Sequence, residues 1–106
     1  MMPQQKQLNL LGLATRSRNL VSGDEMVERA IKQGRVQVVV CASDASEATR
    51  QRYTDLCERE NTQLNTDFTR FEISHAIGKS RSICAISNRG MSEKFLSYVT
   101  GAKQHE

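Results

Sequence analysis

The sequence has no tryptophan, and its 106 residues include only three phenylalanines and two tyrosines. A core built from this chain is therefore mainly aliphatic. No stretch approaches the roughly 20 consecutive apolar residues of a membrane-spanning helix, and the N-terminal MMPQQKQ lacks the apolar segment of a secretory signal. These absences predict a cytoplasmic protein without a membrane partner. The length supports one hydrophobic core, so we expect a single domain over residues 1–106, ordered from about residue 4 to 101.

Motifs for metal binding and catalysis are also missing. Cys41, Cys57 and Cys84 are far apart and form no CxxC pair, which argues against a zinc ribbon or a thioredoxin-type site. Cys41 and Cys84 fall in expected strands, where a thiol behaves as a small hydrophobic side chain. His75 is accompanied by no nucleophile motif and no metal-ligand cluster. We therefore predict no catalytic residue, no metal and no cofactor, and hence a protein that is not an enzyme.

One short motif suggests phosphate binding but fails in its context. Gly78-Lys79-Ser80 matches the end of a phosphate-binding P-loop. The full pattern needs a glycine five residues before Gly78, where Ile73 stands, and it needs a strand before the loop and a helix after it. We expect the opposite order of elements here, so nucleotide hydrolysis is not predicted.

Residues 22–46 carry the clearest local signals for secondary structure. Ser22 and Glu25 have the spacing of a helix capping box, in which the serine oxygen accepts a main-chain N–H and the glutamate reaches back. An apolar stripe at helical spacing follows, and Gly34 stands where a left-handed residue commonly ends a helix. The stripe consists of Met26, Val27, Ala30 and Ile31.

A strand and another helix are expected after this first helix of the stretch. Residues 36–40 are almost entirely valine, a composition typical of a strand that is covered on both faces. Asp44 and Glu47 then repeat the capping spacing, which predicts a helix that runs to about residue 60.

The rest of the chain alternates between helical and strand-like segments. Helices are expected at about residues 4–15, 69–78 and 88–100; Thr69 and Glu72 open the second with a capping box, and Gly101 ends the third. Gly12 inside the first helix indicates close packing. Short strands are expected at residues 19–21, 61–67 and 82–87. The alternation predicts an α/β fold, namely a three-layer α-β-α sandwich with a small mixed sheet of about four short strands and about five helices.

The net charge of +3 is unevenly distributed. Residues 1–35 hold six basic and three acidic residues, residues 36–69 hold three and six, and residues 70–106 hold six and three. If the two basic ends meet in the fold, they form a positive surface on one side of the molecule, as phosphate binding requires. A generic solvated surface remains the alternative at this point.

Several segments, in order, resemble one family of RNA-binding proteins. They are GDEMVERA at residues 23–30, VVVCASDAS at residues 38–46 and HAIGKS at residues 75–80. Over about residues 7–100 the chain resembles the kink-turn-binding ribosomal protein family, whose archaeal and eukaryotic members belong to the large subunit, and in particular its small bacterial YlxQ-like branch. The resemblance implies a non-catalytic, monomeric protein that binds structured RNA, of the ribosome or elsewhere. The alternative is a protein–protein adaptor on the same fold without specific RNA binding.

The resemblance also implies an RNA site at the start of the second helix. Family members that bind kink-turns carry glycine, any residue, asparagine, glutamate, two residues and lysine there. Gly23 keeps the glycine, Arg29 replaces the lysine, Glu25 stands at the asparagine position and Met26 at the glutamate position. Ionised glutamate only accepts hydrogen bonds, and methionine offers no useful one, so we expect weaker or altered recognition. Asp24 adds an acid near the RNA phosphates; alternatively, Asp24 and Glu25 merely stabilise the helix start.

A second implied contact region is the loop that follows residue 77. Lys79 and Arg81 are placed to hold phosphates, and Arg81 also to stack on a base. Arg70 falls where relatives carry a basic residue that faces the same RNA, and Asp44 falls on the adjacent loop. Ile77 is either an apolar RNA contact or a core residue, and the sequence leaves both possibilities open.

Overall fold

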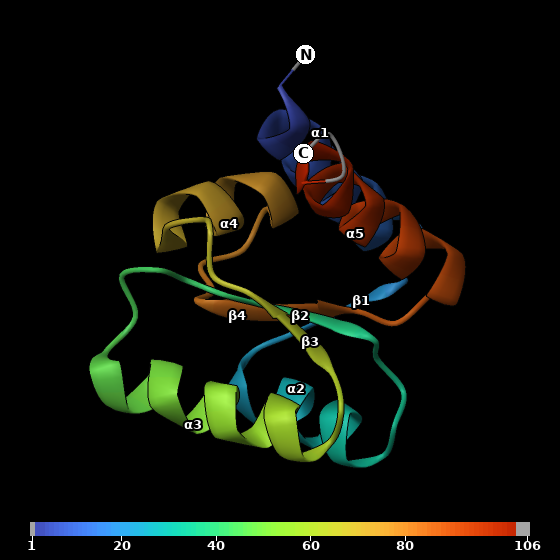
Figure 1. The fold of residues 1–106 in the computed structure, drawn as a ribbon. Coiled ribbons are helices and arrows are strands. Elements are labelled where there is room, and N and C mark those ends of the chain that lie inside the picture. The colour runs from blue at the N-terminus through green and yellow to red at the C-terminus, as the bar shows by residue number, and fades with distance from the viewer. Residues whose placement is uncertain (1, 104–106) are drawn as a thin grey trace.

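Four short strands form one sheet in the order β1-β4-β2-β3 (Figure 1). The computed structural model describes the backbone of residues 2–103 and the side chains of residues 2–98. The strands are β1 (Leu20–Ser22), β2 (Val38–Cys41), β3 (Gln63–Asn65) and β4 (Ile83–Ile86). β2 runs parallel to β3 and antiparallel to β4, and β1 runs antiparallel to β4. The sheet is therefore mixed, as predicted.

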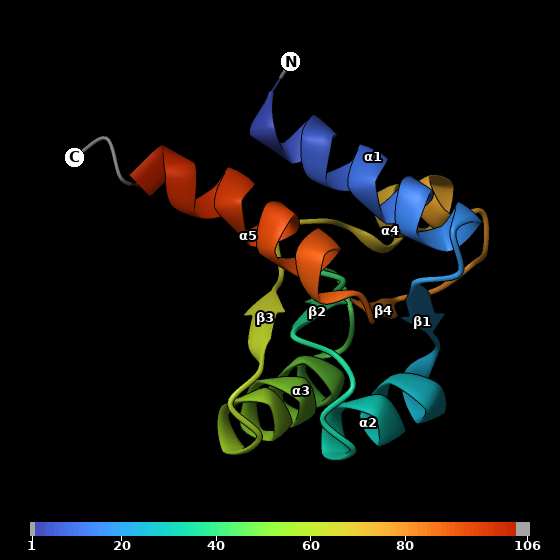
Figure 2. The ribbon, with the colours of Figure 1, turned by 90° about the vertical axis from the view of Figure 1, so that its right-hand side faces the viewer.

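Helices cover both faces of this sheet, so the predicted three-layer sandwich is confirmed. α1 (Pro3–Arg16), α4 (Arg70–Ile77) and α5 (Arg89–Lys103) lie on one face, and α2 (Asp24–Lys32) and α3 (Glu47–Arg59) lie on the other (Figures 1 and 2). α1 packs against both α4 and α5, so parts of the two basic ends of the chain meet on one side of the sheet, whereas α2, with Arg29 and Lys32, lies on the other. No helix among residues 2–103 has the length and the hydropathy that crossing a membrane requires.

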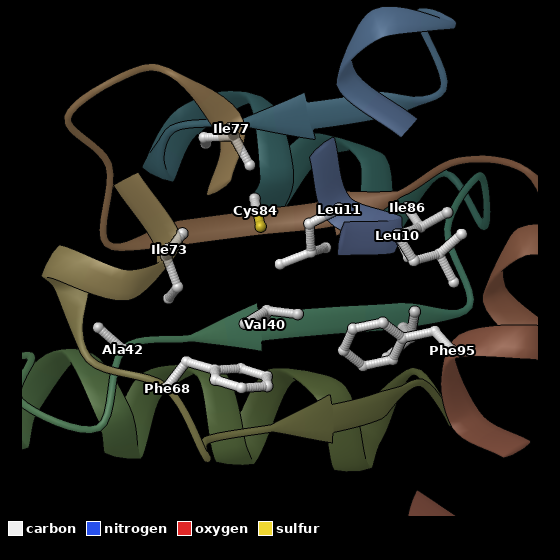
Figure 3. Close-up of a cluster of buried hydrophobic side chains, with 11 residues drawn as sticks. Leu10, Leu11, Val40, Ala42, Phe68, Ile73, Ile77, Cys84, Ile86 and Phe95 are labelled. Carbon is white, nitrogen blue, oxygen red and sulfur yellow. The ribbon is translucent and has the colours of Figure 1, made fainter. Parts of the chain in front are cut away.

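The two central strands divide the core into two layers. Every residue of β2 and β4 is buried, as the run of valines predicted for β2. Val38 and Val40 pack with the side chains of α1, α4 and α5, several of which are drawn in Figure 3. Val39 and Cys41, which point to the opposite face, pack with those of α2 and α3. Side chains alternate between the faces of a strand, so one short strand contributes to both layers.

The three cysteines are buried and form no disulfide, which confirms the prediction of Cys41 and Cys84 as core residues. Cys41 ends β2, Cys57 lies in α3 and Cys84 lies in β4. Burial raises the pKa of the Cys57 thiol to about 11 and that of the Cys84 thiol to about 12. Thiols protected in this way are inert at neutral pH.

Two predicted helix caps are wrong, because strand pairing takes Ser22 and a bond to α4 takes Asp44. Ser22 belongs to β1, so Gly23 is the N-cap of α2 and no side chain caps this helix. Asp44 accepts a hydrogen bond of 2.8 Å from the main-chain N–H of Arg70, and Ser46 caps α3 in its place.

Met26 and Gly101 also depart from their predictions. The side chain of Met26 is 49% exposed, because this residue is rotated by about 100° from the centre of the buried stripe. The buried stripe of α2 consists of Val27, Ala30 and Ile31. α5 continues through Gly101 to Lys103, since a glycine inside a helix costs only about 1 kcal/mol and need not end it.

Other local predictions are confirmed. Thr69 and Glu72 form a reciprocal capping box at the start of α4, and Gly78 ends this helix in the left-handed conformation. Gly34 has a φ of 70° after α2. Gly12 marks the close contact of α1 with α4, because a Cβ at this position would lie 3.1 Å from the main-chain oxygen of Ala76.

Candidate functional site

A groove of about 550 Å³ opens at the end of the sheet where α2 begins. It brings together six of the ten residues that the sequence suggested. They are Gly23, Asp24, Glu25, Met26, Arg70 and Arg81. Side chains from the start of α3 and from the loop between α4 and β4 complete its walls. The residues come from four separate segments, so the fold rather than sequence proximity assembles this site.

The first turn of α2 forms one wall of the groove. Its N-cap is Gly23, which has a φ of 96° and no side chain that could satisfy the N–H groups of the first turn. Such N–H groups, together with the positive end of the helix dipole, favour an anion. The backbone of Gly23 is itself anchored, because its N–H donates to the main-chain oxygen of Ile83 at 3.0 Å.

Arg81 lies directly against Gly23. A Cβ at position 23 would be 3.5 Å from Nε of Arg81, so a glycine leaves room for this side chain. The main chain of Arg81 is fixed by Ser74, whose hydroxyl accepts from the N–H and donates to the carbonyl oxygen. Nη1 donates to the main-chain oxygen of Ser80 at 3.1 Å, whereas the buried Nε has no partner among the residues that the structure describes. A buried guanidinium donor without a partner marks this wall as a place for an acceptor from a ligand.

Arg70 connects the groove to both of its neighbouring loops. Its guanidinium donates to the hydroxyl oxygens of Ser80 and Ser82, the first at 2.8 Å. Its main-chain N–H donates to the Asp44 carboxylate. Arg70 therefore holds the loop that carries Arg81 and still presents a positive charge to the groove.

Asp24 points away from the cations of the groove and toward α3. Its carboxylate accepts from Arg52 at 2.6 Å and from the hydroxyl of Tyr53, which also lies 3.0 Å from the Asp24 main-chain oxygen. Hydrogen bonds from Arg52 and then Tyr53 hold the pKa of Asp24 below its usual value. Desolvation and the neighbouring Asp24 carboxylate raise the pKa of Tyr53, which stays a neutral donor. Asp24 thus fixes the start of α2 to α3.

Glu25, Met26 and Arg29 face outward. The side chain of Glu25 is 88% exposed and lies 3.9 Å from the Arg29 guanidinium, an ion pair of one helical turn that water largely screens. Met26 presents an exposed thioether beside Glu25 on the groove. Arg29 follows on the outer surface of α2, with a side chain that is 56% exposed.

Ile77 and Lys79 lie outside the main groove. Ile77 is 5% exposed and belongs to the core under α1 and α4, which favours the core role of the two that the sequence left open. Lys79 lines a neighbouring depression together with Arg18 and Ser22. Because Ser22 also lines the main groove, the two depressions adjoin.

Sequence reasoning missed the side chains that set the geometry of the site. Nothing in the spacing of Asp24 from Arg52 and Tyr53 predicts that the three meet, because Asp24 is on α2 and the other two are on α3. Ser80 and Ser82 likewise gave no signal as partners of Arg70. Among the residues that the structure describes, no three His, Cys, Asp or Glu side chains gather as metal ligands would.

Comparison with known proteins identifies the class of protein to which this fold belongs. Residues 5–96 match the model of the ribosomal protein L7Ae/L30e/S12e/Gadd45 family, and the chain belongs to this family. The resemblance stated from the sequence is therefore confirmed.

Three of the similar proteins are bacterial. An Enterococcus faecium protein named RNA-binding protein YlxQ is 32% identical over 98 residues, which are 92% of this chain and 95% of that protein. Its Bacillus subtilis namesake is 34% identical over 91 residues, 85% of this chain and 91% of that protein. A solved Bacillus halodurans structure, of unknown function, is 33% identical with a TM-score of 0.85 and covers 90% of this chain and 97% of its own. The Giardia lamblia 15.5kD RNA binding protein has a TM-score of 0.81 at 13% identity over 96% of this chain and 88% of its own, and shares the fold.

Proposed function

We propose that this protein is a non-catalytic RNA-binding protein that recognises a bent, kink-turn-like element in ribosomal or other structured RNA. Relatives that are 32–34% identical over most of their length are named RNA-binding proteins. The observation in the structure that carries the proposal is the groove in which the uncapped start of α2 faces Arg70 and Arg81. Main-chain N–H groups and guanidinium donors are the groups that bind phosphate in RNA backbones. We further propose a cytoplasmic monomer.

The mode of recognition follows from the groups that line the groove. Arg81 offers a buried Nε donor next to a glycine, so a phosphate can approach both the guanidinium and the helix start. Glu25 accepts from exocyclic amino groups of bases, whereas Met26 offers only apolar contact. We therefore propose that backbone shape contributes more to binding here than base-specific hydrogen bonds do.

Titration of labelled RNA tests the proposal. The purified protein is measured against a kink-turn RNA and against the same RNA with its G·A pairs changed to Watson–Crick pairs, at two salt concentrations. We expect preference for the bent RNA and a steep loss of affinity with salt. Equal, salt-sensitive binding to both RNAs would leave only a generic basic surface.

A pair of matched variants locates the contact. Arg81→Ala should weaken binding by about 10- to 100-fold, the value of a lost charge-assisted hydrogen bond, and lower the salt slope by about 1. Arg59→Ala removes the same charge from the last turn of α3, where the side chain is 63% exposed, and should change neither value. Equal losses in both variants would place RNA somewhere other than the groove.

The alternative function is a protein–protein adaptor on the same fold. The acid Glu25 and the exposed Met26 favour it, because they stand where kink-turn-binding members carry asparagine and glutamate. Absence of binding to either RNA at low salt would move the assignment to the adaptor.

A further inference from the structure

A second groove, of about 700 Å³, lies between α1 and α4 and contains an exposed aromatic pair. The Phe71 side chain is 77% exposed. Such exposure is unusual for a large hydrophobic ring. Its ring stacks on His75 of the next turn, with an interplanar angle of 7° and centroids 6.1 Å apart. The two rings line the groove on the side of α4.

Gly12 shapes the floor of this groove. A Cβ at position 12 would lie 3.1 Å from the main-chain oxygen of Ala76 and 3.4 Å from Nη1 of Arg16. The missing side chain thus lets α1 approach α4 and leaves space for the Arg16 guanidinium beside the aromatic pair. The groove therefore combines a stacking surface with a positive charge.

One cation and one acid line the groove. Arg16 is its cation, and Glu72 is the acid that lines it. The Glu72 carboxylate accepts from the main-chain N–H of Thr69 at 2.9 Å in the capping box, so part of its charge is used within α4. Gln5, which donates to Asn9, supplies further polar atoms along α1.

Further cations follow Arg16 at the end of α1. Arg16 is the last residue of α1, and Arg18 and Lys79 line the depression that follows it. That depression shares Ser22 with the main groove, where Arg81 lies. Figure 2 shows that α4 lies beside the C-terminal half of α1, and that the chain continues from the end of α1 through β1 to α2. Cations therefore lie both in this groove and in the depression beside the main groove.

We propose that the groove between α1 and α4 binds an unpaired nucleotide of the RNA whose bent element occupies the main groove, with its base on Phe71 and its phosphate at Arg16. This inference rests on the proposed function. Stacking on an exposed aromatic ring next to an arginine is how proteins hold single-stranded RNA without reading its sequence. The cations Arg16, Arg18 and Lys79 favour RNA over a separate protein partner, because they attract a polyanion that already occupies the main groove.

The test compares three RNAs that share one kink-turn core. The first is the core alone, the second carries a short single-stranded adenosine extension, and the third carries an abasic extension of equal length. The wild-type protein should bind the adenosine extension about 5-fold more tightly than the abasic one, the lower end of what stacking of one base contributes. Extensions are placed at either end of the core in separate RNAs.

Variants separate the base from the phosphate. Phe71→Ala should abolish the preference for adenosine over abasic extension and leave binding of the core unchanged. Arg16→Ala should weaken binding of both extended RNAs and leave the core unchanged. Leu13→Ala, a matched loss of an exposed apolar side chain from α1, should alter nothing. A photoreactive 5-iodouridine in the extension should cross-link to the segment that contains Phe71.

The outcomes are distinguishable. If the core binds but neither extension adds affinity in the wild type, the second groove does not bind RNA and the inference is overturned while the proposed function stands. If the Phe71→Ala variant binds all three RNAs as tightly as the wild type does, the inference is also overturned. That result would point to a protein partner at the aromatic pair. Failure of the core itself to bind overturns the proposed function, and the inference with it.

Discussion

Replacing Tyr53 with phenylalanine isolates the contact that fixes α2 to α3. The ring is fully buried and stays in place, so the change removes one hydroxyl and leaves little empty space. That hydroxyl reaches both the carboxylate and the main-chain oxygen of Asp24. A hydrogen bond to a charged group contributes about 1.5–3 kcal/mol. The Asp24 side chain is 57% exposed, so water competes for it, and we expect a loss of about 1 kcal/mol in the free energy of unfolding at neutral pH.

The pH dependence of this loss distinguishes the two acceptors. The pKa of Asp24 is lowered by Arg52 and then by Tyr53. A lowered carboxyl pKa contributes stability that is present above the unfolded value of 3.8 and is lost as the pH falls through the folded value. The cost of Tyr53→Phe should therefore shrink as the pH falls below 3.8, since a protonated carboxyl no longer accepts a charge-assisted bond.

Urea unfolding between pH 7 and about pH 2 measures the effect, which corresponds to a shift of about 4–8 °C in Tm at neutral pH. Tyr98→Phe is the matched control, because it removes the hydroxyl of the chain's other tyrosine. An equal loss at every pH would refute the reasoning, since the main-chain oxygen of Asp24 would then be the acceptor that matters. A double-mutant cycle with Asp24→Asn gives the coupling directly.

Three further predictions concern the scaffold of the site. Gly12→Ala should lower the free energy of unfolding by about 1 kcal/mol in urea titrations, because the contact of its Cβ with the Ala76 oxygen outweighs the gain in helix propensity. A gain of about 1 kcal/mol instead would mean that α4 shifts away from α1 and relieves this contact. Arg18, with a φ of 63°, occupies a conformation that suits glycine, so Arg18→Gly should raise Tm by a few degrees and a lower Tm would contradict this. Alkylation at pH 8 should leave Cys57 and Cys84 unmodified in the native protein and proceed in urea; rapid native labelling would show that the core opens.

The sequence predicts the fold well where the signal is local. Thr69 and Glu72 cap α4 because both partners lie within one turn, and no other element competes for them. The run of valines in β2 predicts burial on both faces, because few other environments accept so many β-branched residues in succession. The five helices and the mixed four-stranded sheet follow from such local signals.

Prediction from the sequence fails where a distant segment competes for the backbone or the side chain of a residue. Ser22 has the spacing of a cap, but pairing with β4 draws it into β1. Asp44 also has that spacing, but the main-chain N–H of Arg70, 26 residues away, takes its carboxylate. The same limit applies to the site. The resemblance to a family suggested residues of the groove, whereas the contacts of Asp24 with Arg52 and Tyr53 depend on how α2 and α3 pack.

The acids at the start of α2 are less of an obstacle to an RNA partner than their number suggests. The sequence places Asp24, Glu25 and Glu28 within five residues. Arg52 forms ion pairs with Asp24 at 2.6 Å and Glu28 at 3.3 Å, which draws two of these charges toward α3. Glu28 also pairs with Lys32 at 3.1 Å.

Glu25 is therefore the acid whose charge faces an incoming phosphate, since its pair with Arg29 is long and exposed. Against it stand the guanidinium groups of Arg70 and Arg81 and the N–H groups of the first helical turn. In the proposed function, the repulsion by one exposed carboxylate is thus outweighed by two cations and a helix dipole. In the proposed function, we therefore expect any difference in RNA preference from the kink-turn-binding members at Glu25 and Met26, which line the groove, and at Arg29, which replaces their lysine.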